Sequence, residues 1–173
     1  MIILMGASAT GKTEVGKLLQ AKYGINKVVT YTTREKRINE IEDVDYHFLS
    51  KEEFIKLKDT NFFFETVEYN DNYYGTSYSS LVDNSYLIVE PSGFKKYLNS
   101  DINYTSFYLE SSKEVRLNRM IIRGDRIENA QKRIEVDDDV FNSELRNLVN
   151  HVINTDFITL DKVAEIIINY YKK

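Results

Sequence analysis

Residues 1–13, Met1-Ile2-Ile3-Leu4-Met5-Gly6-Ala7-Ser8-Ala9-Thr10-Gly11-Lys12-Thr13, decide the fold of this chain. Residues 1–5 form an unbroken apolar run, which is typical of a strand buried on both faces of a parallel sheet. Residues 6–13 match the spacing G-x-x-x-x-G-K-[ST] at every fixed position. Val15, Leu18 and Leu19 then recur with helical spacing. The stretch therefore predicts a strand, a glycine-containing loop and a helix, in that order.

Each fixed position of this loop has a physical reason. Glycines let the backbone wrap an anion so that several N–H groups point inward, and the start of the helix adds its positive dipole end. Lys12 brings a charge to the outer phosphates of a nucleoside triphosphate, and the Thr13 hydroxyl can ligand Mg²⁺. An ordinary strand-to-helix turn is the alternative, but the order of strand, loop and helix favours a phosphate loop.

Length and composition exclude several other classes of protein. A chain of 173 residues with 42% hydrophobic residues predicts one compact domain. The absence of cysteine excludes disulfides and thiolate metal sites, and two histidines are too few for a histidine-rich zinc site. The net charge of −4 provides no basic field for nucleic acid. No apolar run of about 18 residues and no signal-peptide pattern is present, so we expect a cytoplasmic protein that binds no membrane.

Further elements follow from periodicity and from capping residues. Ser50 and Glu53 form a capping box that opens a short helix, Gly24 and Gly124 end helices, and Asn70-Asp71-Asn72 is typical of a hairpin turn. We predict a loop over 123–131, a long helix from Ile134 to Leu148 and a final helix over 160–171. Strands are predicted at 28–31, 46–49, 62–69, 73–77, 85–90, 104–109 and 151–154.

Because these strands alternate with helices, we predict an α/β fold of the P-loop NTPase type, with a parallel sheet flanked by helices. A small, mostly β subregion is inserted between the first and third core strands. Glu90 ends a core strand, at the edge where open α/β sheets bind ligands.

Several charged or aromatic residues are candidates for binding. Arg34 and Arg37, beside threonine hydroxyls, suit a phosphate dianion, although that stretch alone favours a solvated loop. Glu65 lies among aromatic residues and needs a partner if it points inward. Taken alone, Tyr46 and Tyr74 fit an aromatic core better than a binding site. We interpret His47 and His151 as structural, and the acidic run 135–139 as a solvated helix face.

Together these residues carry a resemblance to a known family. The phosphate loop is followed by Thr32-Thr33-Arg34-x-x-Arg37-x-x-Glu40, Asp45-Tyr46-x-Phe48, Phe64-Glu65, Tyr74-Gly75-Thr76-Ser77 and Leu87-Ile88-Val89-Glu90. In this order the motifs resemble those of guanylate kinases, closely through residue 80 and more loosely afterwards.

The resemblance implies phosphoryl transfer from ATP, with Mg²⁺, to a nucleoside monophosphate, most plausibly GMP or dGMP. It divides the single domain into a core (1–31, 81–122 and 134–173), an acceptor-binding subregion (32–80) and a lid (123–133). Nucleotides would be the small-molecule partners, and both monomer and homodimer stay open.

The same resemblance assigns roles by position. ATP would contact the phosphate loop (Gly6, Ala7, Ser8, Ala9, Thr10, Gly11, Lys12 and Thr13) and Asn154. The acceptor would contact Thr30, Arg34, Arg37, Tyr46, Glu65, Tyr74, Thr76 and Glu90. Of these, Glu65, Thr76 and Glu90 would recognise the base. The catalytic charges would be Lys12, Arg37, Arg119, Arg123 and Arg133, although Arg119 and Arg133 could instead be surface helix residues.

A carboxylate suits guanine because the N1–H and the N2 amino group are adjacent donors. Adenine presents no such pair, so the carboxylate would be left buried and unpaired with AMP.

The chain departs from the family pattern in ways that bear on the acceptor. Ala9 stands where the loop usually has a glycine. The core strand usually carries two acids, but here the first is Ile88 and the second is Glu90 in place of aspartate. The lid is slightly short, with Arg126 as an extra arginine. We expect reduced turnover from the missing acid.

Two rival functions stay open at this point. One is a kinase of the same fold that acts on ribose 1,5-bisphosphate or another deoxynucleotide, which Ile88 mildly favours. The other is a non-catalytic binding module, against which the retained Lys12 and Thr13 argue.

Overall fold

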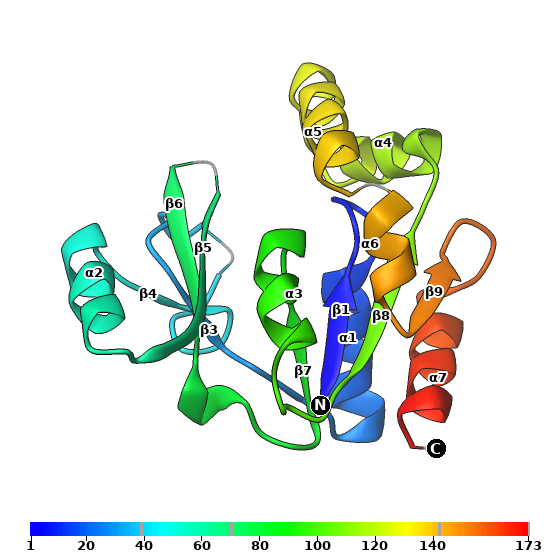
Figure 1. Ribbon diagram of the computed structural model, residues 1–173. Helices are drawn as coiled ribbons and strands as arrows, with labels where there is room; N and C mark the ends of the chain where they lie inside the picture. Colours follow the sequence, from blue (N-terminus) through cyan, green and yellow to red (C-terminus); the bar gives the residue numbers. More distant parts are fainter. Residues whose placement is uncertain (39, 70, 142, 173) are drawn as a thin grey trace.

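Two sheets lie beside each other in the computed structural model, which describes residues 1–38, 40–69, 71–141 and 143–172 (Figure 1). The core sheet has five parallel strands in the order β2-β7-β1-β8-β9. Its strands are β1 (Ile2–Met5), β2 (Asn26–Lys27), β7 (Ser85–Ile88), β8 (Thr105–Glu110) and β9 (His151–Asn154). The predicted parallel α/β core is therefore confirmed.

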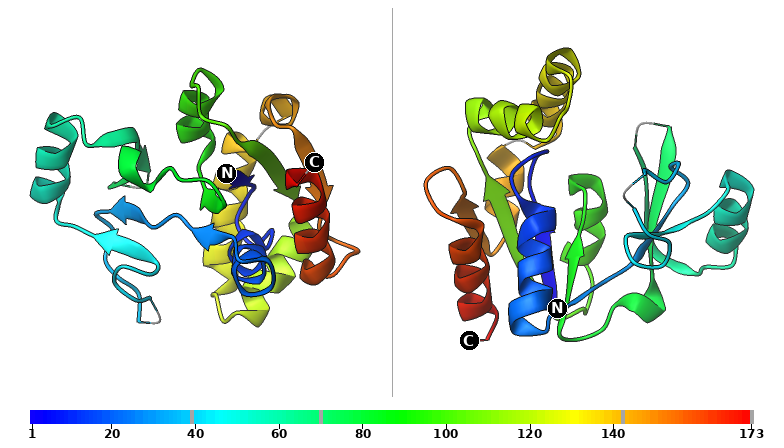
Figure 2. Two further views of the ribbon diagram at one scale, coloured as in Figure 1. Left: turned by 90° about the horizontal axis from the view of Figure 1, so that it is seen from below. Right: turned by 180° about the vertical axis from the view of Figure 1, so that it is seen from behind.

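The central strand β1 shows why the first apolar run is buried on both sides. Ile2 and Leu4 pack into one hydrophobic cluster with α1 (Lys12–Tyr23) and α7 (Leu160–Tyr171). Ile3 and Met5 pack into a second cluster with α3 (Pro91–Leu98) and α6 (Ser143–Leu148). Seen from behind, α1 and α7 cover the near face of the sheet (Figure 2). The alternation of side chains along a strand thus gives each face its own core.

The second sheet is mixed, in the order β4-β3-β6-β5. Its strands are β3 (Thr30–Thr32), β4 (Tyr46–Phe48), β5 (Phe63–Tyr69) and β6 (Asn72–Ser77), and α2 (Lys51–Asp59) packs against it. A short 3₁₀ turn, η1 (Tyr78–Ser80), follows β6. The remaining helices, α4 (Lys113–Ile122) and α5 (Ile127–Val140), pack against each other above the core sheet (Figure 1).

The predicted caps are present. Ser50 accepts from the Glu53 amide while Glu53 accepts from the Ser50 amide, which completes the capping box of α2. Gly24 ends α1 with φ 66°, a left-handed conformation that glycine adopts without strain. β5 and β6 form the predicted hairpin by pairing Tyr69 with Asn72, although the turn residue Asn70 lies outside the described residues.

Two predictions of long elements were wrong. The strand expected at 28–31 is not continuous, because β2 ends at Lys27, residues 28–29 cross to the second sheet, and only Thr30 and Tyr31 of this stretch belong to β3. The helix expected from Ile134 to Leu148 starts earlier, at Ile127, and is broken at Phe141. Phe141 has φ −99° and ψ 68°, and its ring packs into the second core cluster. Tertiary packing therefore ends the helix at a residue that fits the helical period.

Two further boundaries also differ. Half of the loop predicted over 123–131 is helical, since α5 begins at Ile127. β7 stops at Ile88, so Glu90 is the N-cap of α3 rather than the last strand residue. Helix α3 was not predicted, although Pro91 at its first position is a common start of a helix. No helix among the described residues is long and apolar enough to cross a membrane.

Candidate active site

A cavity of about 260 Å³ separates the phosphate loop from the second sheet. It lies at the carboxyl ends of β1 and β7, where parallel sheets bind ligands. Most of the predicted site residues line it: Ser8, Ala9, Lys12, Thr13, Thr30, Arg34, Arg37, Tyr46, Glu65, Tyr74, Thr76, Glu90, Arg123 and Arg133. It is also lined by residues that were not predicted as site residues: Val67, Tyr69, Gly75, Ile88 and Val89. Arg119, Asn154 and the loop residues Gly6, Ala7, Thr10 and Gly11 are not among the lining residues.

The phosphate loop leaves β1 through backbone conformations that depend on its sequence. Gly6 has φ 146°, and a Cβ there would lie 2.2 Å from the Leu109 carbonyl oxygen, so no other residue fits. Ala9, which stands in place of the family's glycine, has φ 62°. Left-handed backbone costs a non-glycine residue about 1–2 kcal/mol, so the loop keeps its shape at Ala9 against some strain.

Lys12 is the first residue of α1, and its ammonium folds back onto its own loop. Its Nζ donates to the carbonyl oxygens of Gly6 and Ala7. Burial lowers the pKa of Lys12 to about 8, although the nearby Glu90 and Asp137 carboxylates oppose this shift. A bound polyphosphate would place further negative charge beside this buried ammonium and so favour its protonated form.

An unpredicted ion pair holds the loop from above. The Arg116–Asp137 pair joins α4 to α5 at 2.7 Å, and both side chains are only 4% exposed. Asp137 accepts from the Ser8 amide at 2.8 Å, and Arg116 Nε donates to the Ser8 carbonyl oxygen at 2.9 Å. The prediction of a solvated face over 135–139 was therefore wrong for Asp137.

A signal for this pair was present in the sequence. Asp137 follows Ala130 by seven positions and Ile134 by three, and all three are buried on one face of α5. An acid on the apolar face of a helix requires a partner.

Three of the arginines predicted to be catalytic, Arg119, Arg123 and Arg133, lie in different environments. Arg133 Nε donates to Ser8 Oγ at 2.9 Å, at the wall of the cavity. Arg123 also lines the cavity and is paired with Asp125. Arg119 lies behind the loop, where it donates to the carbonyl oxygens of Ala9 and Thr155. In this arrangement Arg119 supports the loop backbone instead of facing the cavity.

Arg34 and Arg37, which were predicted to bind an acceptor phosphate, both line the cavity. Arg34 Nη2 lies 2.7 Å from Glu40, and its guanidinium lies 5.5 Å from the centre of the Tyr46 ring. Burial would raise the pKa of Glu40, but hydrogen bonds from Arg34 and the Arg37 amide outweigh it and lower that pKa. Glu40 thus neutralises part of the charge that a phosphate dianion would otherwise meet.

A paired carboxylate also lines the cavity. Thr76 Oγ1 of β6 donates to Glu65 Oε1 of β5 at 2.7 Å. The other oxygen, Oε2, lies against Gly93 of α3, where an added Cβ would approach within 2.9 Å. Burial raises the pKa of Glu65 to about 7, despite the Thr76 hydrogen bond. Burial also raises the pKa of Glu90. A buried carboxylate with a free oxygen suits a ligand with two adjacent N–H donors.

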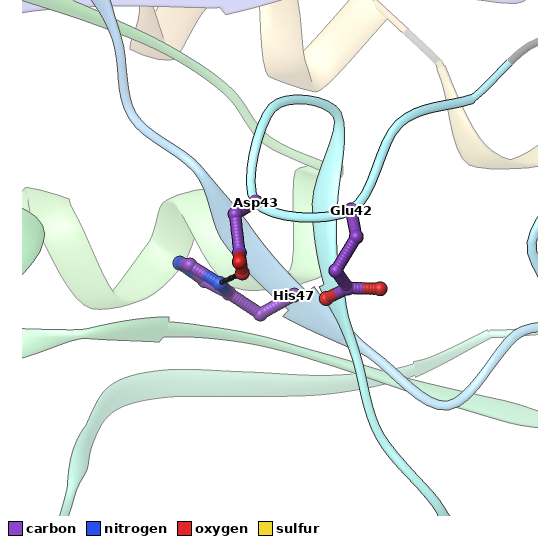
Figure 3. Close-up of side chains that lie close together, drawn as sticks. All are labelled: Glu42, Asp43 and His47. Atoms are coloured by element: carbon purple, nitrogen blue, oxygen red, sulfur yellow. Dashed lines mark hydrogen bonds and ion pairs between the residues drawn. The ribbon is translucent and has the colours of Figure 1, made fainter.

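Two other candidate positions lie away from this cavity. Asn154 is exposed at the end of β9, and its Oδ1 accepts from the Asp156 amide. Glu42 and Asp43, in the loop before β4, come together with His47 of β4 (Figure 3). His47 Nδ1 lies 2.7 Å from Asp43, and its ring packs on Tyr31. These contacts agree with a structural role for His47.

Comparisons with known proteins point in one direction. The sequence profile described as "Guanylate kinase" matches residues 1–170. The guanylate kinase of Bartonella henselae is 40% identical over 76 residues, which cover 44% of this chain and 34% of that protein. The guanylate kinase of the Aster yellows witches'-broom phytoplasma is 44% identical over 85 residues, or 48% and 40% of the two chains. The matched stretches therefore span less than half of these curated relatives.

A solved structure extends the similarity over nearly the whole chain. The crystal structure of guanylate kinase from Anaplasma phagocytophilum superposes with a TM-score of 0.69 at 26% sequence identity. This match covers 98% of the present chain and 82% of the other.

Proposed function

The chain belongs to the guanylate kinase family, and from this we propose that it transfers the terminal phosphoryl group of ATP to GMP or dGMP. The products would be ADP and GDP or dGDP. The observation that carries the proposal is the cavity itself, since Lys12 and Thr13 of the phosphate loop share its walls with the Glu65–Thr76 pair. A phosphate donor and a base with paired N–H donors can therefore meet in one site.

The acceptor end recognises its ligand in two parts. Arg34 and Arg37 would bind the acceptor phosphate, with the hydroxyls of Tyr46 and Tyr74 beside them. Glu65 would accept from guanine N1–H and N2–H, and AMP would leave its carboxylate unpaired. Thr30 and Glu90 complete the walls around the acceptor.

Catalysis would then rest on positioning and charge. The acceptor phosphate is already an anionic nucleophile, so the chain needs no general base. Lys12 and Arg133 face the space between loop and acceptor, where the terminal phosphoryl group would pass. Arg123 would join them when the lid closes and excludes water.

Mg²⁺ fits the oxygen groups of this site. The Thr13 hydroxyl lines the cavity, and Mg²⁺ prefers oxygen ligands while keeping several waters. Bound with ATP, the ion would neutralise charge on the phosphates.

We also keep the division into core (1–31, 81–122, 134–173), acceptor subregion (32–80) and lid (123–133) as part of the proposal. The cavity between the two sheets supports it, because closure there would bring the two substrates together. Nucleotides are then the partners, and the cytoplasm, where ATP and GMP are available, is the proposed location.

The test is release of ADP from Mg-ATP with a panel of acceptors: GMP, dGMP, AMP, CMP, dTMP and ribose 1,5-bisphosphate. We expect turnover with GMP and dGMP at least about 100-fold above that with AMP, since an unpaired buried charge costs several kcal/mol. Turnover with the sugar phosphate alone would refute the base site. No ADP release with any acceptor of the panel would refute the kinase activity.

A further inference from the structure

Tyr97 is a buried residue of α3 that the proposed function leaves unexplained. Its side chain is fully buried, and its hydroxyl makes no hydrogen bond with any residue that the structure describes. Its ring packs against Phe64 at 4.8 Å and Tyr104 at 6.2 Å. Phenylalanine would provide the same packing, whereas an unpaired buried hydroxyl costs about 1–3 kcal/mol. Such a group calls for a specific explanation.

The position of the hydroxyl suggests one. Gly93, one helical turn before Tyr97 on α3, lies against Glu65 Oε2. Phe64, which contacts the Tyr97 ring, is the neighbour of Glu65 on β5. Burial and then the Glu65 charge raise the pKa of Tyr97, whereas the Thr76 hydroxyl acts in the opposite direction. The phenol therefore lies beside the Glu65–Thr76 pair, and Tyr97 is not among the residues that line the cavity.

We propose that Tyr97 is a positioning residue for base recognition, and that a small shift of its hydroxyl, which is unpaired among the described residues, lets it donate to Thr76 Oγ1. Thr76 already gives its only hydrogen to Glu65, so its oxygen can accept from Tyr97. The three side chains would form one directed chain of hydrogen bonds from α3 through β6 to β5. Glu65 would then act only as an acceptor, the state that guanine requires. This inference rests on the proposed function.

The proposed series of hydrogen bonds would favour the ionised form of Glu65. Successive hydrogen bonds polarise one another, so a donor behind Thr76 strengthens the bond that Thr76 gives to the carboxylate. Few other charges face Glu65. Lys58 of α2 and Lys95 and Lys96 of α3 line a wider hollow of about 740 Å³ on its other side, and Glu90 lies across the acceptor cavity. Tyr97 would thus help Glu65 to stay ionised near neutral pH.

Tyr97→Phe tests this with the loss of one oxygen atom. We expect KM for GMP at pH 7 to rise about 3- to 10-fold, the range of a net hydrogen bond. The increase should shrink towards pH 9, where Glu65 is ionised in both proteins, and KM for ATP should stay unchanged. Tyr104→Phe is the matched control, because the Tyr104 ring contacts the Tyr97 ring but the Tyr104 hydroxyl has no part in the proposed series of hydrogen bonds.

A second measurement is independent of turnover. The titration of Glu65 in the free protein can be followed by the ¹³C shift of its carboxyl carbon. Tyr97→Phe should move its midpoint up by about half a pH unit or more, and Tyr104→Phe should not. An unchanged midpoint, or a KM raised equally at every pH, would overturn the proposal. A wild-type protein that does not use GMP would refute the proposed function, while the carbon titration would still decide the role of Tyr97.

Discussion

Glu65→Gln should separate the two ends of the cavity, because it removes a charge at the base end and leaves the phosphate loop intact. In the structure Thr76 donates to Oε1, and Oε2 lies beside Gly93. Glutamine keeps nearly the same shape and one acceptor, but it places an NH₂ donor where the second acceptor was. One of the two guanine N–H groups would then face another donor.

The size of the effect follows from that single lost contact. A hydrogen bond to a charged group contributes about 1.5–3 kcal/mol, so kcat/KM for GMP should fall about 10- to 150-fold. KM for ATP should change by less than about twofold, since Lys12 and its loop are untouched. Discrimination against AMP should weaken in the same proportion.

The assay is ADP release at saturating Mg-ATP with GMP varied from pH 6 to pH 9. Burial places the pKa of Glu65 at about 7 in the empty site. In the wild type, kcat/KM for GMP should therefore rise as the pH passes through 7 and the carboxylate ionises. Glu65→Gln should lose this dependence and keep only the ionisation of the GMP phosphate near pH 6.

The control is Glu68→Gln, the same change on the same strand at an exposed position. It should leave both KM values within about twofold of the wild type. An unchanged KM for GMP in Glu65→Gln, or an equal loss in Glu68→Gln, would refute the assignment of Glu65 to the base.

Four further predictions concern the loop and the fold. Lys12→Met should abolish transfer while GMP still binds in calorimetry. In the wild type, kcat/KM for ATP should fall as the pH rises through about 8, where Lys12 loses its charge. Asp137→Asn should lower the free energy of unfolding in urea by about 2 kcal/mol, because Arg116 loses its buried charged hydrogen bond and keeps only the more exposed Asp138, at 3.4 Å; Asp139→Asn, at an exposed position of α5, should have little effect. Ser50→Ala should remove about 1 kcal/mol by breaking a capping box, measured in the same way.

The parts of the fold that were predicted correctly are those with a local cause. The run 1–5 is buried on both faces because every second residue meets a different cluster. The capping box at Ser50 and the left-handed Gly24 need only neighbours within a few residues. Such features can be recognised without knowing what they pack against.

The errors arose where a distant contact overrides the local pattern. Phe141 fits the helical period, but its ring belongs to the core cluster beneath the sheet, and the helix ends there. Residues 28–31 look like one strand, but the chain changes sheets within them. Neither event is encoded by spacing alone, because each depends on which partner surface is nearest in the folded chain.

In the site, too, local features were predicted and contacts between distant residues were not, and Asp137 is the clearest example. Ile88 stands where the family usually carries an acid, and the motifs indicate no replacement for that charge. In the folded chain Asp137 reaches the phosphate loop from 129 residues away, and its charge acts on Lys12. No spacing rule connects Asp137 with the phosphate loop. An acid in register with the buried residues of α5 is itself buried, however, and therefore requires a cation or an amide as its partner. Arg116 and Ser8 supply both, so a charge on an apolar helix face is the feature that would have predicted this contact.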